Sequence, residues 1–229
     1  LSLAGVLIGV VLAWQVGNFR LGVIHILSVG LLWFYAKSYK KFFLVGNLVV
    51  AGLSALAVLI VALYEPRLYT AQPIMGEMMQ PVARQLVMGF VIFAFAISFI
   101  RELVKDMEDV EGDRHFNSKT LPIVIGVKNA RFVTVLLILA LTGLTFFIQQ
   151  NLLPPIAKFL QTDAMMDFAN NGLQYTCYLL YGMYLLTAWS IVTAENILHY
   201  RRTSTILKIT MIIGTLSMLA YSIEFGRAV

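Results

Sequence analysis

Seven apolar stretches, most of them close to the length that spans a lipid bilayer, constrain the fold of this 229-residue chain more than any other feature. They cover roughly residues 1–14, 21–36, 43–64, 86–104, 132–149, 173–194 and 206–223. A helix needs about 20 mainly apolar residues to cross roughly 30 Å of hydrocarbon. Backbone groups must be hydrogen-bonded within lipid, and the alternation typical of a barrel strand is absent. The sequence therefore predicts an all-α integral membrane protein.

The charges between these stretches alternate in number from one loop to the next. One set of loops holds ten cations, namely Lys37, Lys40, Lys41, Lys105, Arg114, Lys119, Lys128, Arg131, Arg201 and Arg202. The other set holds five, namely Arg20, Arg67, Arg84, Lys158 and Arg227. Because positively charged loops stay preferentially in the cytoplasm, we expect the first set on the cytoplasmic side of a bacterial or archaeal inner membrane.

Several other classes of protein are disfavoured by what the chain does not contain. No basic stretch is interleaved with aromatic residues in the way that nucleic-acid binding requires. The single cysteine, Cys177, cannot form an internal disulfide. The three histidines do not show the close spacing of a zinc site.

The segment DMEDVEGD, residues 106–113, stands out because it places carboxylates directly after an apolar stretch. On a helix that continues this stretch through residues 101–114, Asp106, Asp109 and Asp113 fall within about 60° of arc. Glu108 and Glu111 would point elsewhere. Three carboxylates on one stripe repel each other unless water or a cation separates them. Mg²⁺ prefers such oxygen ligands and often joins carboxylates to a substrate phosphate.

Cations next to the acidic segment suggest what it binds. Arg101, Lys105, Arg114 and Lys119 lie around it. Carboxylates, a metal ion and Lys or Arg together are the groups expected around a diphosphate leaving group. The alternative is a solvated helix of mixed charge at the membrane surface, since most charge runs are solvated faces.

Two segments resemble motifs of the UbiA family of intramembrane prenyltransferases. The stretch RELVKDMEDVEGDRHFNSKTLPIVIG, residues 101–126, is similar to the second Asp-rich motif of that family, with its preceding R-E pair and following K-T-L-P-x-x-x-G. The stretch YAKSYKKFFLVGNLVVA, residues 35–51, is similar to the family's Y-x-x-x-x-K-[KR]-x-x-x-x-G-N-x-x-V-A segment. The order of motifs and spans extends the resemblance over essentially the whole chain.

The resemblance implies a ring of transmembrane helices around a central cavity that is capped by cytoplasmic helical loops. It implies transfer of a polyprenyl group from its diphosphate to a membrane-associated acceptor, with Asp106, Asp109 and Asp113 as the catalytic and Mg²⁺-binding residues. The combination of both motifs is most similar to the geranylgeranylglycerol-phosphate geranylgeranyltransferase branch, which implies a geranylgeranyl donor and a prenylglycerol phosphate acceptor. An aromatic quinone precursor is the alternative acceptor.

Six further residues become candidates for binding the substrate or its diphosphate. They are Tyr35, Lys40, Asn47, Arg101, Lys105 and Lys119. Simpler roles exist for three of them. Lys40 could anchor the end of a span and Tyr35 could belong to an interfacial belt of aromatic residues. Asn47, four or five residues into the third stretch, could serve helix packing.

One feature departs from the family. UbiA proteins have nine spans and a first Asp-rich motif after the second span, and no such motif occurs here. We therefore expect residues 1–229 to be a single transmembrane prenyltransferase domain that lacks the first two spans and is inactive alone. A family member that has lost its first motif is another possibility. A transporter or scaffold is disfavoured, because the charges cluster at one interface and the spans show no repeated halves.

Overall fold

A computed structural model describes residues 2–37, 42–65, 79–151 and 166–228, and every regular element in these ranges is a helix. The helices are α1 (Ser2–Gln15), α2 (Phe19–Lys37), α3 (Val45–Leu63), α4 (Met79–Glu108), α5 (Val110–His115), α6 (Leu121–Ile125), α7 (Val127–Asn151), α9 (Met166–Val192) and α10 (Ile197–Ala228). The all-α class predicted from the apolar stretches is confirmed.

Each of the seven apolar stretches forms one long helix, and the two short helices lie between α4 and α7. Within the described ranges, four helices are long and apolar enough to cross a membrane, namely α2, α3, the part of α4 from Arg84 to Glu108, and α7. Helix α1 is apolar but shorter. In length and composition these helices are like membrane spans.

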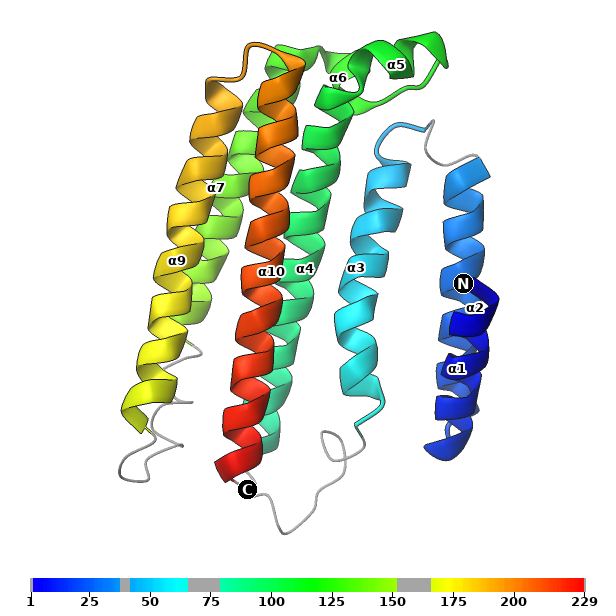
Figure 1. The fold of residues 1–229 in the computed structure, drawn as a ribbon, viewed down its shortest axis with the longest axis vertical. Coiled ribbons are helices and arrows are strands. Elements are labelled where there is room, and N and C mark those ends of the chain that lie inside the picture. The colour runs from blue at the N-terminus through cyan, green and yellow to red at the C-terminus, as the bar shows by residue number, and fades with distance from the viewer. Residues whose placement is uncertain (1, 38–41, 66–78, 152–165, 229) are drawn as a thin grey trace.

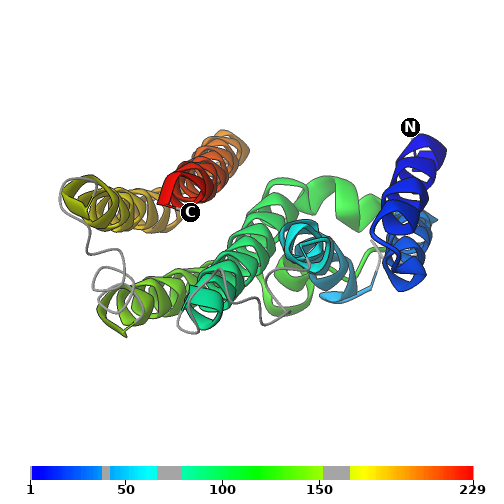
Figure 2. The same ribbon diagram turned by 90° about the horizontal axis from the view of Figure 1, so that it is seen from below.

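The long helices run side by side, and α5 and α6 lie across one end of them (Figure 1). Seen along their axes, α4, α7, α9 and α10 pack around one another, and α3, α2 and α1 extend from α4 to one side (Figure 2). Helix α4 is central to the packing, since it contacts α3, α7 and α10. Helix α9 packs against α7 and α10, and α1 packs against α2.

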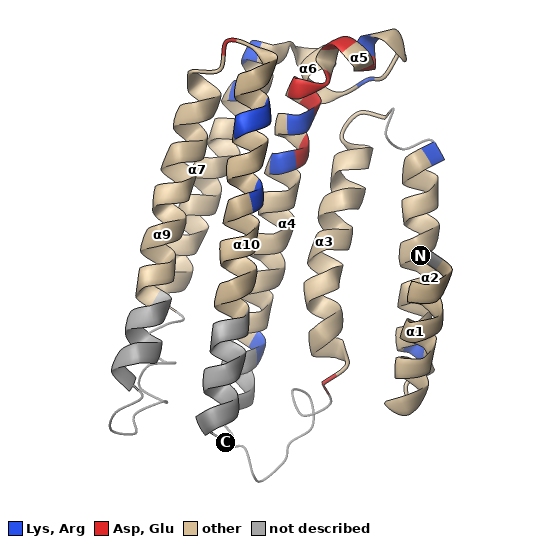
Figure 3. Cartoon of the chain, in the orientation of Figure 1, with Lys and Arg blue, Asp and Glu red and all other residues tan. Residues whose placement is uncertain are grey.

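Charged residues gather at the end of the molecule where α5 and α6 lie (Figure 3). This end contains the last turns of α4 and the first turns of α7 and α10. The described charges near the opposite end are few, and they include Arg20, Glu65 and Arg84. The structure thus places the acidic segment and most of the described cations together, as the loop charges predicted. The cytoplasmic orientation of this end stays a prediction.

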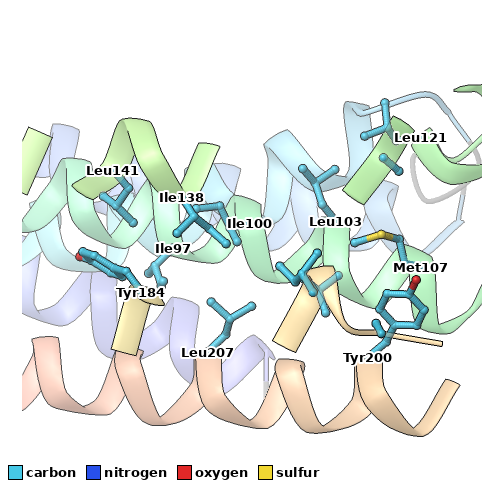
Figure 4. Close-up of a cluster of buried hydrophobic side chains, with 14 of the residues drawn as sticks. Ile97, Ile100, Leu103, Met107, Leu121, Ile138, Leu141, Tyr184, Tyr200 and Leu207 are labelled. Carbon is cyan, nitrogen blue, oxygen red and sulfur yellow. The ribbon is translucent and has the colours of Figure 1, made fainter. Parts of the chain in front are cut away.

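The hydrophobic core lies where α4 meets α6, α7, α9 and α10 (Figure 4). Its best buried side chains on α4 are Ile97, Ile100, Leu103 and Val104, each at most 1% exposed. Outside this core, many large apolar side chains point outward, as with Trp189 of α9 at 70% exposure. Such exposure is expected of helices whose outer faces contact lipid instead of water.

Two contacts fix the antiparallel register of α4 and α10. The Arg201 Nε atom of α10 donates to Glu108 Oε1 of α4 at 3.0 Å. Further along both helices, Gly214 of α10 lies directly against the ring of Phe93, which leaves no room for a Cβ atom. Residues of α10 that follow Arg201 therefore lie level with residues of α4 that precede Glu108.

Candidate functional site

A polar pocket lies where the C-terminal end of α4 meets the N-terminal end of α3. Its acidic lining comes from Glu102, Asp106, Asp109 and Asp113. The remaining lining residues are Tyr35 of α2, Gly46 and Asn47 of α3, and Lys105 of α4. The two sequence motifs, residues 35–51 and 101–126, therefore meet at one place in the fold.

The three aspartates line the pocket, but they do not lie on one continuous helix as expected. The prediction of a single helix through residues 101–114 is wrong, because α4 ends at Glu108 and α5 begins at Val110. Asp109 lies at the break, with φ −95° and ψ 8°. Asp109, Val110 and Gly112 are all weak helix formers, so a change of axis at this point costs little. Helix α5 turns away from the axis of α4 (Figure 1).

The helical winding nevertheless continues across the break. Asp109 N donates to Lys105 O at 2.9 Å, and Asp113 N donates to Asp109 O at 2.9 Å. These bonds keep the side chains of Asp106, Asp109 and Asp113 on the pocket even though the axis bends. Asp113 is buried, with 6% exposure, whereas Glu111 is exposed and does not line the pocket.

Asn47 connects α3 directly to the acidic segment. Its Nδ2 atom donates a hydrogen bond of 2.7 Å to Asp106 Oδ2, and its side chain is buried. Helix α3 begins only at Val45, after Leu44 in a left-handed conformation with φ 56°, so Asn47 lies in the first turn and not deeper in the span. This contact favours a role in the site over a role in packing alone.

Glu102 is the pocket residue that sequence reasoning missed. Its side chain is 6% exposed, and Arg101 Nη1 donates to its Oε1 atom at 2.8 Å. A buried carboxylate requires such a partner. The sequence contained a signal for this position, because Glu102 and Asp106 are four residues apart and share a helix face.

The other predicted binding residues divide into three groups. Tyr35 and Lys105 line the pocket. Arg101 and Lys119 are not among its lining residues: Arg101 pairs with Glu102, which does line the pocket, and Lys119 is exposed ahead of α6. Lys40 lies outside the described residues.

The donor atoms of the pocket suit Mg²⁺ in kind. In the described part of the chain, no three Asp, Glu, His or Cys side chains are already gathered tightly enough to coordinate one ion. Mg²⁺ needs fewer protein ligands than that, since it keeps several waters and is commonly held by one or two carboxylates plus substrate phosphates. Four carboxylates carry more negative charge than one lysine ammonium balances, so the pocket suits a divalent cation.

Comparison with known proteins gives a consistent result. The profile of the UbiA prenyltransferase family matches residues 1–166. A protein named digeranylgeranylglyceryl phosphate synthase from Saccharolobus solfataricus is 29% identical over 99% of this chain and 69% of its own length. Its namesake from Thermococcus kodakarensis is 28% identical over 94% of this chain and 65% of its own length.

A shorter match reaches higher identity. The namesake from Pyrococcus furiosus is 35% identical over 55% of this chain and 39% of its own length. The two relatives that match nearly all of this chain are longer than it is, and the chain spans about two thirds of their length. No solved structure matches significantly.

Proposed function

The chain belongs to the UbiA prenyltransferase family, and we propose on this basis that the full-length protein transfers a prenyl group from its diphosphate to an acceptor in the membrane. The observation that carries this proposal is the pocket that gathers Glu102, Asp106, Asp109 and Asp113 beside Lys105 at the polar end of the helices. Because the chain spans about two thirds of its longest-matching relatives, the activity is proposed for the full-length protein.

Each group of the pocket has a chemical task in this reaction. Asp106, Asp109 and Asp113 would hold Mg²⁺, which would supply positive charge to the departing diphosphate. Asn47 holds the Asp106 carboxylate in place through its 2.7 Å hydrogen bond. Lys105 places a further positive charge at the pocket, and we also assign diphosphate contacts to Lys119 and Lys40.

The bond changes follow from this arrangement. The bond between the first prenyl carbon and the diphosphate oxygen breaks, and its electron pair leaves with the diphosphate. The acceptor oxygen then bonds to the same carbon and loses its proton.

We infer the substrates from the relatives that match most of the chain. Their names specify synthesis of digeranylgeranylglyceryl phosphate. We therefore propose geranylgeranyl diphosphate as the donor and a geranylgeranylglycerol phosphate as the acceptor. We place the polar end of the molecule on the cytoplasmic side, because its loops carry most of the cations.

The test is release of diphosphate by the full-length protein in nanodiscs with both substrates and Mg²⁺. Asp106→Ala, Asp109→Ala and Asp113→Ala should each lower kcat/KM about a hundredfold or more, since comparable electrostatic contacts to a leaving group are worth that much. Glu111→Ala is the matched control, because Glu111 belongs to the same acidic segment but is exposed outside the pocket. It should behave as wild type.

Two results would change the conclusion in different ways. Folded aspartate variants that keep full activity would remove the acidic pocket from the mechanism. Diphosphate release only with an aromatic acceptor would retain the reaction class and reject the lipid acceptor.

A further inference from the structure

Helix α10 contains a lysine about two turns beyond the charged residues of its first turns. Lys208 is exposed and lies seven residues beyond Arg201, about 10 Å further along the helix axis. The described residues give its ammonium no hydrogen-bond or ion-pair partner. A cation at this depth in a membrane protein is costly unless it meets water or an anion, and it usually marks a functional position.

The helix geometry shows which way Lys208 faces. Seven residues make almost two full turns, so Lys208 lies on the same flank of α10 as Arg201. The Arg201 guanidinium reaches Glu108 of α4 at 3.0 Å, so this flank faces α4. By contrast, Ile209 and Arg202 lie on another flank of the exposed surface of α10.

The register of the two helices places a second cation at the level of Lys208. Because α10 runs antiparallel to α4, the residue seven positions after Arg201 lies level with the residue seven positions before Glu108. That residue is Arg101, which lies on the same flank of α4 as Glu108. Further along the two helices, Gly214 of α10 contacts Phe93 of α4. Gly214 follows Lys208 and Phe93 precedes Arg101, so the antiparallel register extends past this pair.

We propose that Lys208 and Arg101 form a site for the phosphate monoester of the acceptor, next to the carboxylate pocket. This proposal rests on the proposed function. Arg101 donates from Nη1 to Glu102 and keeps further N–H groups for a phosphate oxygen. Glu102 lines the pocket, so an anion bound at Arg101 is one side chain away from the aspartates.

Electrostatics explains why the acceptor phosphate needs its own cations. The pocket holds four carboxylates, which repel the phosphate of an acceptor. Two cations deeper along α4 and α10 give the acceptor phosphate a separate position. The same pair could also attract an anionic lipid headgroup, since both ligands present a phosphate.

The test measures binding of geranylgeranylglycerol phosphate to the full-length protein without donor, in nanodiscs of phosphatidylcholine. Lys208→Gln should weaken binding about tenfold, the loss expected for one charge-assisted hydrogen bond. Lys208→Arg should restore most of the affinity. Arg202→Gln is the matched control, because it removes an exposed cation from another flank of the same helix, and it should bind as wild type.

Two further measurements identify the group that is recognised. Geranylgeranylglycerol without phosphate should bind equally to wild type and to Lys208→Gln. In turnover assays, Lys208→Gln should raise KM for the phosphorylated acceptor and leave KM for the donor unchanged.

Several outcomes would overturn the proposal. These are unchanged binding of the phosphorylated acceptor by folded Lys208→Gln, an equal loss in Arg202→Gln, or a loss confined to the donor. Competition by phosphatidylglycerol nanodiscs as strong as by the acceptor would assign the site to lipid headgroups instead. Wild-type protein that binds the acceptor through Lys208 but transfers no prenyl group would reject the proposed function and retain the site.

Discussion

Substituting Asn47 by alanine tests whether the contact between α3 and the acidic segment organises the metal site. The 2.7 Å bond from Asn47 Nδ2 to Asp106 Oδ2 is buried, since Asn47 is 7% exposed. A hydrogen bond to a charged group contributes about 1.5–3 kcal/mol, which corresponds to a factor of about 10–150. Loss of a partner that orients a metal ligand typically weakens metal affinity about 10–100-fold. The two estimates agree in size.

We therefore expect Asn47→Ala to raise the Mg²⁺ concentration for half-maximal diphosphate release about 10–100-fold. The maximal rate at saturating Mg²⁺ should fall much less, because the aspartates remain in place. Asn129→Ala is the control, since Asn129 Nδ2 donates only to a backbone carbonyl, Ile125 O, on the surface of α7. Its Mg²⁺ dependence should match wild type.

A double-mutant cycle with Asp106→Asn makes the test specific. If Asn47 acts through Asp106, the two substitutions together should cost clearly less than the sum of their separate effects. The reasoning would be refuted by an Asn47→Ala protein with wild-type Mg²⁺ dependence. Strict additivity in the cycle would also refute it, because Asn47 would then act independently of Asp106.

Three predictions concern stability. Arg201→Gln should change the free energy of unfolding by less than about 1 kcal/mol in thermal denaturation, since the Arg201 side chain is 66% exposed in its ion pair with Glu108; a larger loss would contradict this. Gly214→Leu should lower Tm strongly, because a side chain there meets the Phe93 ring, and overpacking typically costs about 1–3 kcal/mol; an unchanged Tm would show that the ring can move away. Ser98→Ala should be neutral or stabilising, because the buried Ser98 Oγ has no hydrogen-bond partner among the described residues; marked destabilisation would reveal a partner for that hydroxyl.

The apolar stretches were sufficient to predict where the long helices lie, because a continuous run of about 20 apolar residues has few alternatives in a bilayer. The predicted stretch 43–64 became α3 at Val45–Leu63, and 132–149 became the greater part of α7. The helix ends shifted by several residues. The shift at the N-terminal end of α3 affects the site most, because α3 begins at Val45 and Asn47 therefore lies in its first turn.

For the acidic segment, helix periodicity predicted the shared location of the aspartates but not the path of the backbone. Helical spacing correctly suggested that Asp106, Asp109 and Asp113 would lie together, and all three line one pocket. It did not show the break at Asp109, which depends on how α5 and α6 pack against α4 and not on helix periodicity alone. Lys119 follows this break and is exposed outside the pocket, so its contact with the diphosphate stays a prediction. The catalytic roles of these residues stay predictions.

The break at Asp109 would couple metal binding by the aspartates to local folding. Asp106 belongs to a 30-residue helix that the core holds in place, whereas Asp113 belongs to a six-residue helix, which is too short to be stable by itself. An ion that binds both carboxylates would stabilise the folded form of α5 by mass action. Amide hydrogens of α5 should consequently exchange with solvent more slowly as Mg²⁺ and diphosphate accumulate, while those in the middle of α4 should exchange slowly throughout.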